Sequence, residues 1–315
     1  MKKAFLFPGQ GSQFIGMGHE LANQFEAAKD VFLEVDDALG EKLSTLMFQG
    51  DIKDLTLTKN AQPAIMAVSI AVLRIMSENG LDLKAIDFFA GHSLGEYSAL
   101  CASGVISLRD TALMLRKRGL AMQKAVPEGL GSMVAIIGMT SKIVNDLILT
   151  SKCNKELIQV ANDNDPSQVV VSGQKQEVQK FIKFLKQKKP KRIIELPVSA
   201  PFHSPLMKPA ALTMEAELKK VNLSTPIVPI IQNVDLSISN STDGLVERLV
   251  QQVCATVRWR ESLIMMVDTF GVSTFFEIGP GKVLAGTVKR TVPKSNIFSV
   301  GLASQINEVL EILNE

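Results

Sequence analysis

The sequence predicts an α/β protein in which helices flank a mostly parallel sheet, with a smaller ferredoxin-like βαββαβ unit inserted. Over residues 1–127, short apolar runs alternate with longer segments of helical periodicity, which is typical of a parallel sheet covered by helices. Between 128 and 198 the order changes to strand, helix, strand, strand, helix, strand. The longer alternation then resumes. We therefore expect residues 1–127 and 199–315 to form one large subdomain around a small one at 128–198.

The first 127 residues contain the elements that such a sheet requires. Residues 86–90 are apolar on both faces, as in a strand covered on both sides. Pro63 occupies the position that proline favours in the first turn of a helix, so the apolar helix is expected to begin at 64. The expected elements are strand 4–7, helices 16–27, 27–40 and 64–78, strand 86–90, a helix from Leu94 capped by Gly104, and helix 108–124.

The inserted unit and the C-terminal part are assigned from the same periodicities. In the insertion we expect strand 132–138, helix 141–151, strands 156–162 and 168–173, helix 175–188 and strand 192–198. Beyond it we expect strand 227–233, helices 243–254 and 259–270, and strands 274–278 and 297–300.

Composition argues against several classes of function. The 34 lysines and arginines nearly balance the 32 aspartates and glutamates, so the chain lacks the charge of a nucleic-acid binder. The longest apolar helical stretch, 64–76, is interrupted by Ser69 and Arg74 and cannot span a bilayer. Three cysteines without CxxC spacing argue against disulfides and a zinc site. We expect a monomeric cytoplasmic protein that binds no nucleic acid, membrane or metal.

A Gly-x-Ser-x-Gly sequence occupies residues 91–95, between an apolar strand and a helix. A sharp turn there projects the Ser93 hydroxyl above the sheet edge, and the small Gly91 and Gly95 prevent backbone collisions. The helix that begins at Leu94 directs unpaired N–H groups and its positive end at the same place. Ser93 is therefore the candidate nucleophile, and the alternative is an ordinary turn with a serine cap.

A serine nucleophile needs a base, and the chain has three histidines. His92 adjoins the serine in a tight turn, where successive side chains diverge, and His19 lies on an amphipathic helix where surface exposure is expected. His203, in a loop held by two prolines, is the candidate base. No acid stands out as a third member. A carbonyl from the helix that contains Gln251 and Gln252 could orient the imidazole instead.

Three further features concern the pocket and the surface. Gln10, in the turn after the first strand, could face Ser93 across the crevice at the carboxyl ends of the strands. Residues 116–118 (Arg-Lys-Arg) interrupt an apolar helix, and periodicity leaves open whether one binds a carboxylate inside or all form a solvated patch. A solvated face or the docking of an acidic partner would explain the basic residues Lys180, Lys183, Lys186, Lys188, Lys189, Lys191 and Arg192.

Taken together, these segments resemble the malonyl-CoA:acyl carrier protein transacylases, the acyltransferases that feed fatty acid synthesis. The resemblance implies a hydrolase-like α/β core with an inserted ferredoxin-like subdomain, in agreement with the order of elements. One departure is Ala255-Thr256, where relatives usually have Asn-Pro. The matching residues cover essentially the whole chain: 9–13, 62–64, 91–97, Arg118-Gly119, Met122-Gln123, 202–204, 252–259 and 277–283.

The resemblance implies a role for each matching residue. Ser93 would be the nucleophile and His203 its base, and Arg118 would bind the malonyl carboxylate. Backbone N–H groups of Gln10 and Leu94 would form the oxyanion hole. In place of a triad acid, the main-chain carbonyl of Gln252 would orient the histidine. Phe202 would crowd an α-substituent, so we expect malonyl to be preferred over methylmalonyl, while Arg118 selects against acetyl.

The implied reaction is a ping-pong transfer. The malonyl group passes from malonyl-CoA to a Ser93 ester and then to the phosphopantetheine thiol of acyl carrier protein, without a cofactor. The alternatives are a trans-acting acyltransferase of a polyketide pathway, a serine ester or thioester hydrolase, and a noncatalytic docking module. Because acyl carrier proteins are acidic, residues 180–192, or Lys282, Lys289 and Arg290, are expected to steer docking.

Overall fold

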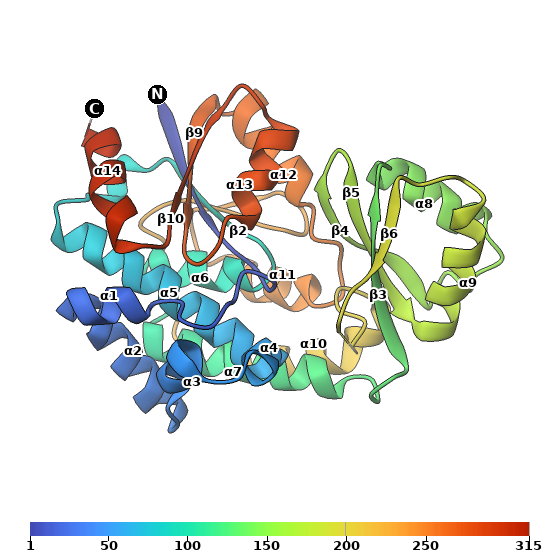
Figure 1. The fold of residues 1–315 in the computed structure, drawn as a ribbon, viewed down its shortest axis with the longest axis horizontal. Coiled ribbons are helices and arrows are strands. Elements are labelled where there is room, and N and C mark those ends of the chain that lie inside the picture. Colours follow the sequence, from blue (N-terminus) through green and yellow to red (C-terminus); the bar gives the residue numbers. More distant parts are fainter. Residues whose placement is uncertain (199, 315) are drawn as a thin grey trace.

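The computed structural model describes residues 1–198 and 200–314, which form two sheets with helices around each (Figure 1). In these residues the larger sheet has six strands, and only β8 is antiparallel to its neighbour. This confirms the mostly parallel sheet that the sequence predicts. The strand order is β10 (Asn296–Val300), β9 (Val272–Ile278), β1 (Lys2–Phe7), β2 (Phe88–Gly91), β7 (Ile230–Ile231), β8 (Ile238–Ser239).

Side chains alternate along β1 and so enter two separate cores. Ala4 and Leu6 pack against two helices on one face, α12 (Trp259–Asp268) and α13 (Val283–Thr291). Phe5 and Phe7 enter the main core on the other face. The helices that contribute to this main core are α1 (His19–Gln24), α2 (Glu26–Leu39), α3 (Leu43–Gln49), α4 (Ile52–Thr56), α5 (Thr58–Glu78), α6 (Leu94–Ala102), α7 (Leu108–Lys124), α10 (Lys208–Leu218), α11 (Leu245–Gln252) and α14 (Ala303–Asn314). Short 3-10 helices span Leu83–Ala85 and Pro205–Met207.

Helix α5 differs from its expected start. It begins at Thr58, so Pro63 lies inside the helix rather than in its first turn. A proline there removes one backbone hydrogen bond, but the apolar residues 64–68 are fully buried and their packing outweighs that loss. This is the one described helix long and apolar enough to cross a membrane, and 89% of its most apolar window is buried inside the protein. Its apolar surface is therefore used by the core.

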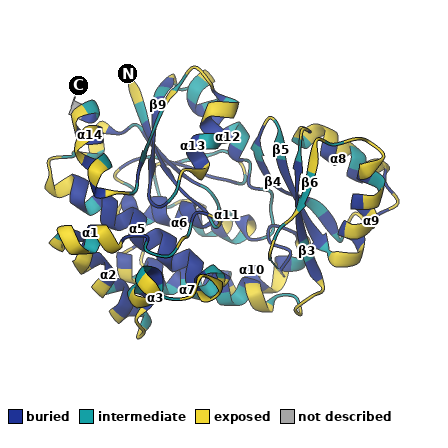
Figure 2. Cartoon of the chain, in the orientation of Figure 1, coloured by how far each residue is buried: buried dark blue, intermediate teal, exposed yellow. Residues whose placement is uncertain are grey.

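Other differences concern helices that the sequence analysis did not assign and strands that are shorter than expected. Helices α3, α4, α10, α13 and α14 were not expected, and strand 227–233 shrinks to the two residues of β7. Strand 192–198 ends at Glu195, because the chain leaves the sheet there and residues 196–198 turn toward the large subdomain to line a cavity. Figure 2 shows the outcome, with buried residues concentrated along the large sheet and the helices against it.

The smaller sheet has the order that a ferredoxin-like unit requires. All its neighbouring strands pair antiparallel: β4 (Ile158–Asp165), β5 (Gln168–Gln174), β3 (Gly131–Ile137) and β6 (Arg192–Glu195). Helices α8 (Ser141–Thr150) and α9 (Lys175–Lys186) pack on it through a separate apolar core. The subdomain boundaries at 127/128 and 198/199 stay a prediction, and residue 199 lies outside the described residues.

Strand β4 also joins the small sheet to the large subdomain. Val257 N–H donates to Ala161 C=O at 2.9 Å, and Asp163 N–H donates to Val257 C=O at 3.0 Å. Arg260 on α12 binds both carboxylate oxygens of Asp163, with N–O distances of 2.8 to 3.0 Å. This junction brings residues of the small sheet to the carboxyl end of the large one, where the candidate site lies.

Candidate active site

The predicted turn at 91–95 connects β2 to α6. Ser93 has φ 54° and ψ −107°, a conformation that few non-glycine residues adopt. The flanking glycines have no room for a side chain. A Cβ on Gly91 would lie 1.9 Å from the Gly95 carbonyl carbon, and one on Gly95 would lie 2.1 Å from the Phe7 carbonyl oxygen. Gly91 is therefore required by the tightness of the turn itself, and Gly95 by the close approach of the turn to β1.

The nucleophile and base candidates meet although 110 positions separate them. Ser93 Oγ lies 2.8 Å from His203 Nε2. The other ring nitrogen, Nδ1, lies 2.8 Å from the backbone oxygen of Gln252. A carbonyl can only accept, so Nδ1 carries the proton and Nε2 is left to accept the serine proton. The geometry supplies a base oriented without a carboxylate.

Burial keeps this base neutral. His203 is 3% exposed. Desolvation, reinforced by the positive charge of Arg118, lowers the pKa of His203 to about 3. The imidazole is therefore unprotonated at neutral pH and can accept a proton. The other histidines lie where the sequence indicates: His92 binds Asn164 at 2.9 Å, and His19 is exposed and stacks on Phe48.

Of the three basic residues at 116–118, Arg118 is the one that points inward. It is 1% exposed, whereas Arg116 pairs with Glu41 and Lys117 with Glu217. The Arg118 guanidinium donates to Gln62 Oε1 at 2.8 Å through one terminal nitrogen. The other terminal nitrogen donates to Gln252 Oε1 at 2.8 Å and to Ser93 Oγ at 3.1 Å.

No carboxylate among the described residues pairs directly with Arg118, and its Nε has no hydrogen-bond partner. The nearest counter-charge is reached through Gln252, whose Nε2 donates to Glu96 Oε2 at 2.8 Å. Glu96 is itself fully buried, and desolvation raises its pKa to about 7. A buried guanidinium without a direct carboxylate partner favours an anionic ligand beside the serine.

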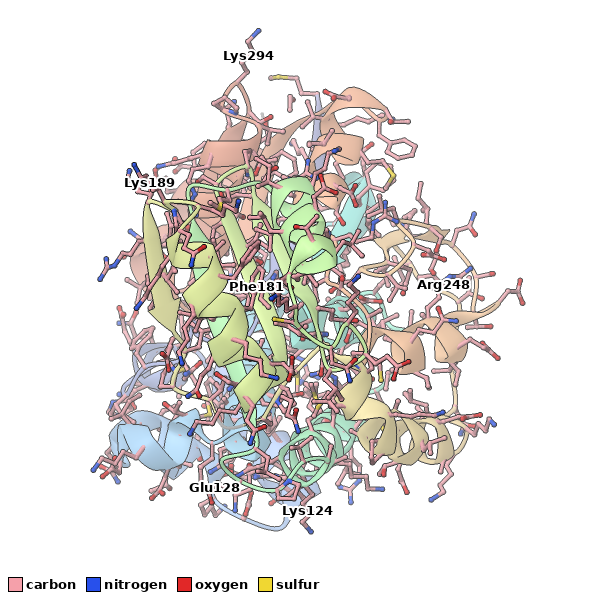
Figure 3. All side chains as sticks on the ribbon, turned by 90° about the vertical axis from the view of Figure 1, so that its right-hand side faces the viewer. Lys124, Glu128, Phe181, Lys189, Arg248 and Lys294 are labelled. Carbon is pink, nitrogen blue, oxygen red and sulfur yellow. The ribbon has the colours of Figure 1, made fainter. Side chains whose placement is uncertain are left out.

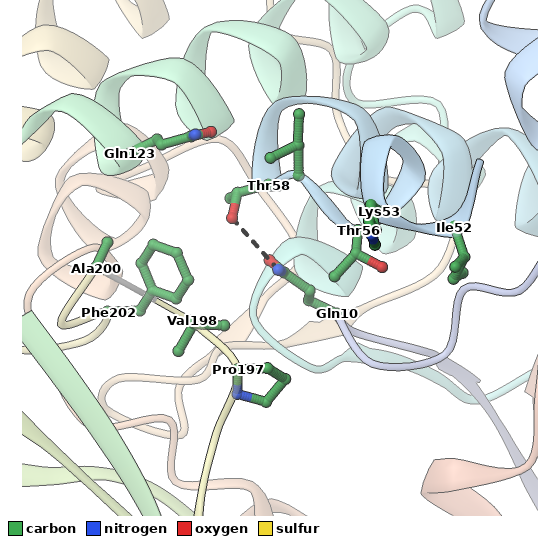
Figure 4. A pocket seen from close by; sticks show the side chains of 11 residues that line it. Gln10, Ile52, Lys53, Thr56, Thr58, Gln123, Pro197, Val198, Ala200 and Phe202 are labelled. Atoms are coloured by element: carbon green, nitrogen blue, oxygen red, sulfur yellow. Dashed lines mark hydrogen bonds between the residues drawn. The ribbon is translucent and has the colours of Figure 1, made fainter. Parts of the chain in front are cut away.

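A cavity of about 230 Å³ joins most of the predicted site residues, namely Gln10, Ser93, Leu94, Arg118, Phe202 and His203. Within the described chain, the N–H groups of Gln10 and Leu94 donate to no acceptor, so both are available to an oxyanion. Gln252 lies behind the cavity. Phe202 and Gln10 also line an adjoining cavity of about 430 Å³, where Gln10 donates to Thr58 at 3.3 Å (Figure 4).

Four polar residues of the site were not singled out from the sequence. Gln62 holds Arg118, Glu96 holds Gln252, and Asn233 and Gln159 hold the backbones of Ser93 and His203. Three of them carried a signal. Gln62 and Glu96 fall in the segments 62–64 and 91–97 that carry the family resemblance, and Asn233 stands at the carboxyl end of an expected strand, where the functional residues of parallel sheets lie. In the described part of the chain, no group of three or more His, Cys, Asp or Glu side chains could hold a metal ion.

The whole chain is similar to known acyltransferases. Residues 4–308 match the model of the family described as the acyl transferase domain. A malonyl CoA-acyl carrier protein transacylase of Bacillus subtilis is 46% identical over 316 aligned positions, covering 100% of this chain and 98% of that protein. The crystal structure of an acyl-carrier-protein-S-malonyltransferase from Bartonella henselae has a TM-score of 0.96 and 51% identity, covering 100% of both chains.

A third similar protein is a malonyl-transacylase solved in complex with a type II polyketide acyl-carrier protein. It has a TM-score of 0.95 and 37% identity, covering 99% of this chain and 100% of that one. Family match, identity and fold agree over the full length. The chain therefore belongs to the acyl transferase family, among the malonyl-CoA:acyl carrier protein transacylases.

Proposed function

We propose that this chain transfers the malonyl group of malonyl-CoA to the phosphopantetheine thiol of acyl carrier protein, and so supplies fatty acid biosynthesis. The observation that carries the proposal is the buried Arg118, whose guanidinium lies 3.1 Å from the Ser93 hydroxyl and has no direct carboxylate partner among the residues that the structure describes. Such a group selects an acyl chain that ends in a carboxylate. The names of similar proteins, one of them in complex with an acyl-carrier protein, support the same substrates.

The first half-reaction forms a malonyl ester on Ser93. His203 Nε2 takes the hydroxyl proton while Ser93 Oγ attacks the thioester carbonyl carbon. The oxyanion that develops accepts hydrogen bonds from the N–H groups of Gln10 and Leu94, and loss of one such donor typically costs ~10²–10³ in rate. The intermediate then expels CoA sulfur, which takes the proton from His203 and leaves as the thiol.

The second half-reaction runs through the same groups. The phosphopantetheine thiol gives its proton to His203 and its sulfur attacks the ester carbonyl. Ser93 Oγ leaves and recovers the proton, which regenerates the enzyme and releases malonyl carrier protein. Throughout, Arg118 holds the distal carboxylate, so the reacting carbonyl stays between Ser93 and the oxyanion donors.

Mass spectrometry of the intact protein tests this proposal. Incubation with malonyl-CoA should add one malonyl group, which peptide mapping should place on Ser93, and Ser93→Ala should stay unlabelled. Subsequent addition of holo acyl carrier protein should move the group to the carrier. Release of malonate to water without a stable adduct would instead indicate a hydrolase. Equal labelling from acetyl-CoA would contradict the role of Arg118.

Three parts of the proposal concern the molecule as a whole. We expect a monomeric, cytoplasmic enzyme that needs no cofactor, because the complete set of reacting groups comes from one chain. Sedimentation of the purified protein and fractionation of cells would test the first two points. Retention of transfer activity after exhaustive dialysis against a chelator would test the third.

A further inference from the structure

The two residues proposed to react share a strained backbone. Among the described non-glycine residues, positive φ occurs at Ser93 (54°), Lys189 (53°), His203 (55°) and Leu236 (62°). This conformation costs of order 1–3 kcal/mol and persists only where surrounding contacts hold it. For both Ser93 and His203, the structure supplies these contacts through a side-chain amide that does not line the cavity.

Asn233 holds the turn around Ser93. It follows β7, the neighbour of β2 in the sheet, and is 1% exposed. Its Oδ1 accepts from Ser93 N–H at 2.8 Å, and its Nδ2 donates to Gly91 C=O at 2.7 Å. One amide therefore ties together both sides of the turn. It also occupies the N–H of Ser93 itself, which leaves Gln10 and Leu94 as the oxyanion donors.

Gln159 holds the backbone of His203 from the small sheet. Its Nε2 donates to His203 C=O at 2.5 Å and to Cys254 C=O at 2.8 Å. The His203 ring is bound to Gln252 C=O at 2.8 Å, only two residues away from Cys254. The base is thus attached to residues 252–254 twice, once through its ring and once through Gln159.

We propose that Asn233 and Gln159 are positioning residues of the acyl transfer, which keep Ser93 Oγ and His203 Nε2 in hydrogen-bonding contact before substrate binds. The inference rests on the proposed malonyl transfer. A displacement of about 1 Å at reacting groups can cost ~10² in rate. Because neither residue lines the cavity, their loss lowers the rate of Ser93 acylation and leaves the affinity for malonyl-CoA unchanged.

The test compares Asn233→Ala and Gln159→Met with matched controls. Gln232→Ala removes a buried amide one residue from Asn233, and Gln168→Met alters the strand beside β4. Rapid quenching and intact-protein mass spectrometry give the rate constant of malonyl labelling and its final extent. The final extent of labelling measures the fraction of folded sites, and the rate constant measures the reactivity of each folded site. Partial unfolding would therefore lower the extent without lowering the rate constant.

We expect both variants to be labelled at least tenfold more slowly per site, and both controls to be labelled at the parent rate. The malonyl-CoA concentration that gives half the maximal labelling rate should stay within twofold of the parent value. Gln159→Glu keeps the shape but, as a carboxylate, cannot donate, so it should be as slow as Gln159→Met. If Asn233→Ala is not recovered folded, Asn233→Ser, which leaves the smaller void, provides the comparison.

Per-site rates within threefold of the parent in the Asn233 and Gln159 variants would overturn the inference. A higher half-saturating malonyl-CoA concentration with an unchanged maximal labelling rate would also overturn it, because that pattern indicates a role in substrate binding. A parent enzyme that malonyl-CoA does not label would contradict the proposed function itself. The two failures are therefore distinguishable within one experiment.

Discussion

At the scale of single residues, the site depends on groups whose charge state burial fixes. His203 stays neutral because a buried imidazolium beside Arg118 is doubly unfavourable. Arg118 remains the positive group that faces the serine, although burial also lowers its pKa from a high ordinary value. Glu96, with a pKa of about 7, has no direct hydrogen bond to Arg118 and is connected to it through the side chain of Gln252. A neutral imidazole and a cationic guanidinium can therefore coexist in one cavity.

The first prediction concerns pH. Since the pKa of His203 is about 3, the rate of Ser93 labelling at saturating malonyl-CoA should not fall with a midpoint near 6.5 between pH 8 and 5. For stability the sign is the opposite of that for a paired histidine. The pKa of His203 is lower in the folded than in the unfolded chain, so protonation favours the unfolded state. The contribution of His203 to the free energy of unfolding is therefore complete above pH 6.5 and declines as pH falls toward 3. Because Glu96 has a pKa of about 7 and could titrate in the same range, Glu96→Gln is the control, and a rate that halves near pH 6.5 in both the parent and this variant would contradict the assignment of a neutral buried base.

The second prediction concerns acyl selection. Arg118→Ala should lower kcat/KM for malonyl-CoA by about a hundredfold or more, because truncation of one partner of a buried charge pair costs about 3 kcal/mol. Labelling by acetyl-CoA should change little, because acetyl has no carboxylate to lose. Circular dichroism and thermal unfolding serve as the control. An equal loss with both substrates, or an unfolded variant, would favour a purely structural role for Arg118.

At the scale of elements, the strand-turn-helix unit of β2 and α6 is held by packing that tolerates no side chain at its glycines. The turn lies against the end of β1, and Asn233 supports it from the side of β7. Each neighbouring strand of the parallel sheet thus contributes to the position of Ser93. The unit works only as part of the sheet, which explains why its sequence motif alone also fits an ordinary capped turn.

The third prediction follows from this packing. Gly95→Ala should lower the free energy of unfolding by about 3 kcal/mol or more and slow Ser93 labelling, because its Cβ meets the Phe7 carbonyl oxygen at 2.1 Å. Gly286→Ala in α13 is the control, since its nearest neighbour is the flexible end of Arg290 at 3.2 Å. The control should be neutral or more stable by up to about 1 kcal/mol. Urea unfolding measures both, and similar midpoints would contradict the packing argument.

At the scale of the whole molecule, the site lies where the two sheets meet. The large sheet supplies Ser93 at the carboxyl end of β2, and the small sheet supplies cavity walls through residues such as Met133 and Asn162. The junction at β4 and α12 holds the two parts together through the buried Asp163 and the half-buried Arg260. The cavity at Ser93 adjoins the larger one, whose lining also includes residues of α4, α5 and α7.

The fourth prediction concerns the carrier protein. Lys282 and Lys289 are exposed, and Lys282 follows β9 at the same carboxyl end of the sheet as the Ser93 turn. The basic run 180–192 lies on the outer side of the small sheet, where Lys189 projects from the surface in Figure 3. We expect Lys282→Glu with Lys289→Glu to raise KM for acyl carrier protein several-fold, and more than Lys183→Glu with Lys186→Glu.

Steady-state kinetics with varied carrier protein measure this effect, and loading from malonyl-CoA should be unchanged. Lys84→Glu is the control, because Lys84 is exposed at the opposite, amino end of β2. The effect should weaken at higher ionic strength, since it arises from exposed charges. Unchanged KM in both double variants would exclude docking by either basic group.

The sequence by itself determined the element types over much of this protein, although it left the amphipathic helix α14 unassigned. Helix 108–124 and the βαββαβ order of the inserted unit match the structure because local periodicity reflects which face is buried. Short elements such as β7 and α4 contain too few residues to show a hydrophobic period. The start of α5 was predicted too late in the chain, because burial of the helix outweighed the preference of proline for the first turn. The motif at 91–95 and the scarcity of histidines were sufficient to choose Ser93 and His203 as candidates.

Only the tertiary structure decided which of the three basic residues at 116–118 enters the site, and which groups hold the reacting pair. Periodicity could not select Arg118, because each of the three has apolar neighbours at helical spacing. Asn233 and Gln159 are far from Ser93 and His203 along the chain, and an amide has no pattern that marks its partner. Their roles arise where two sheets and a loop converge, and such convergence is a property of the folded chain rather than of any local segment.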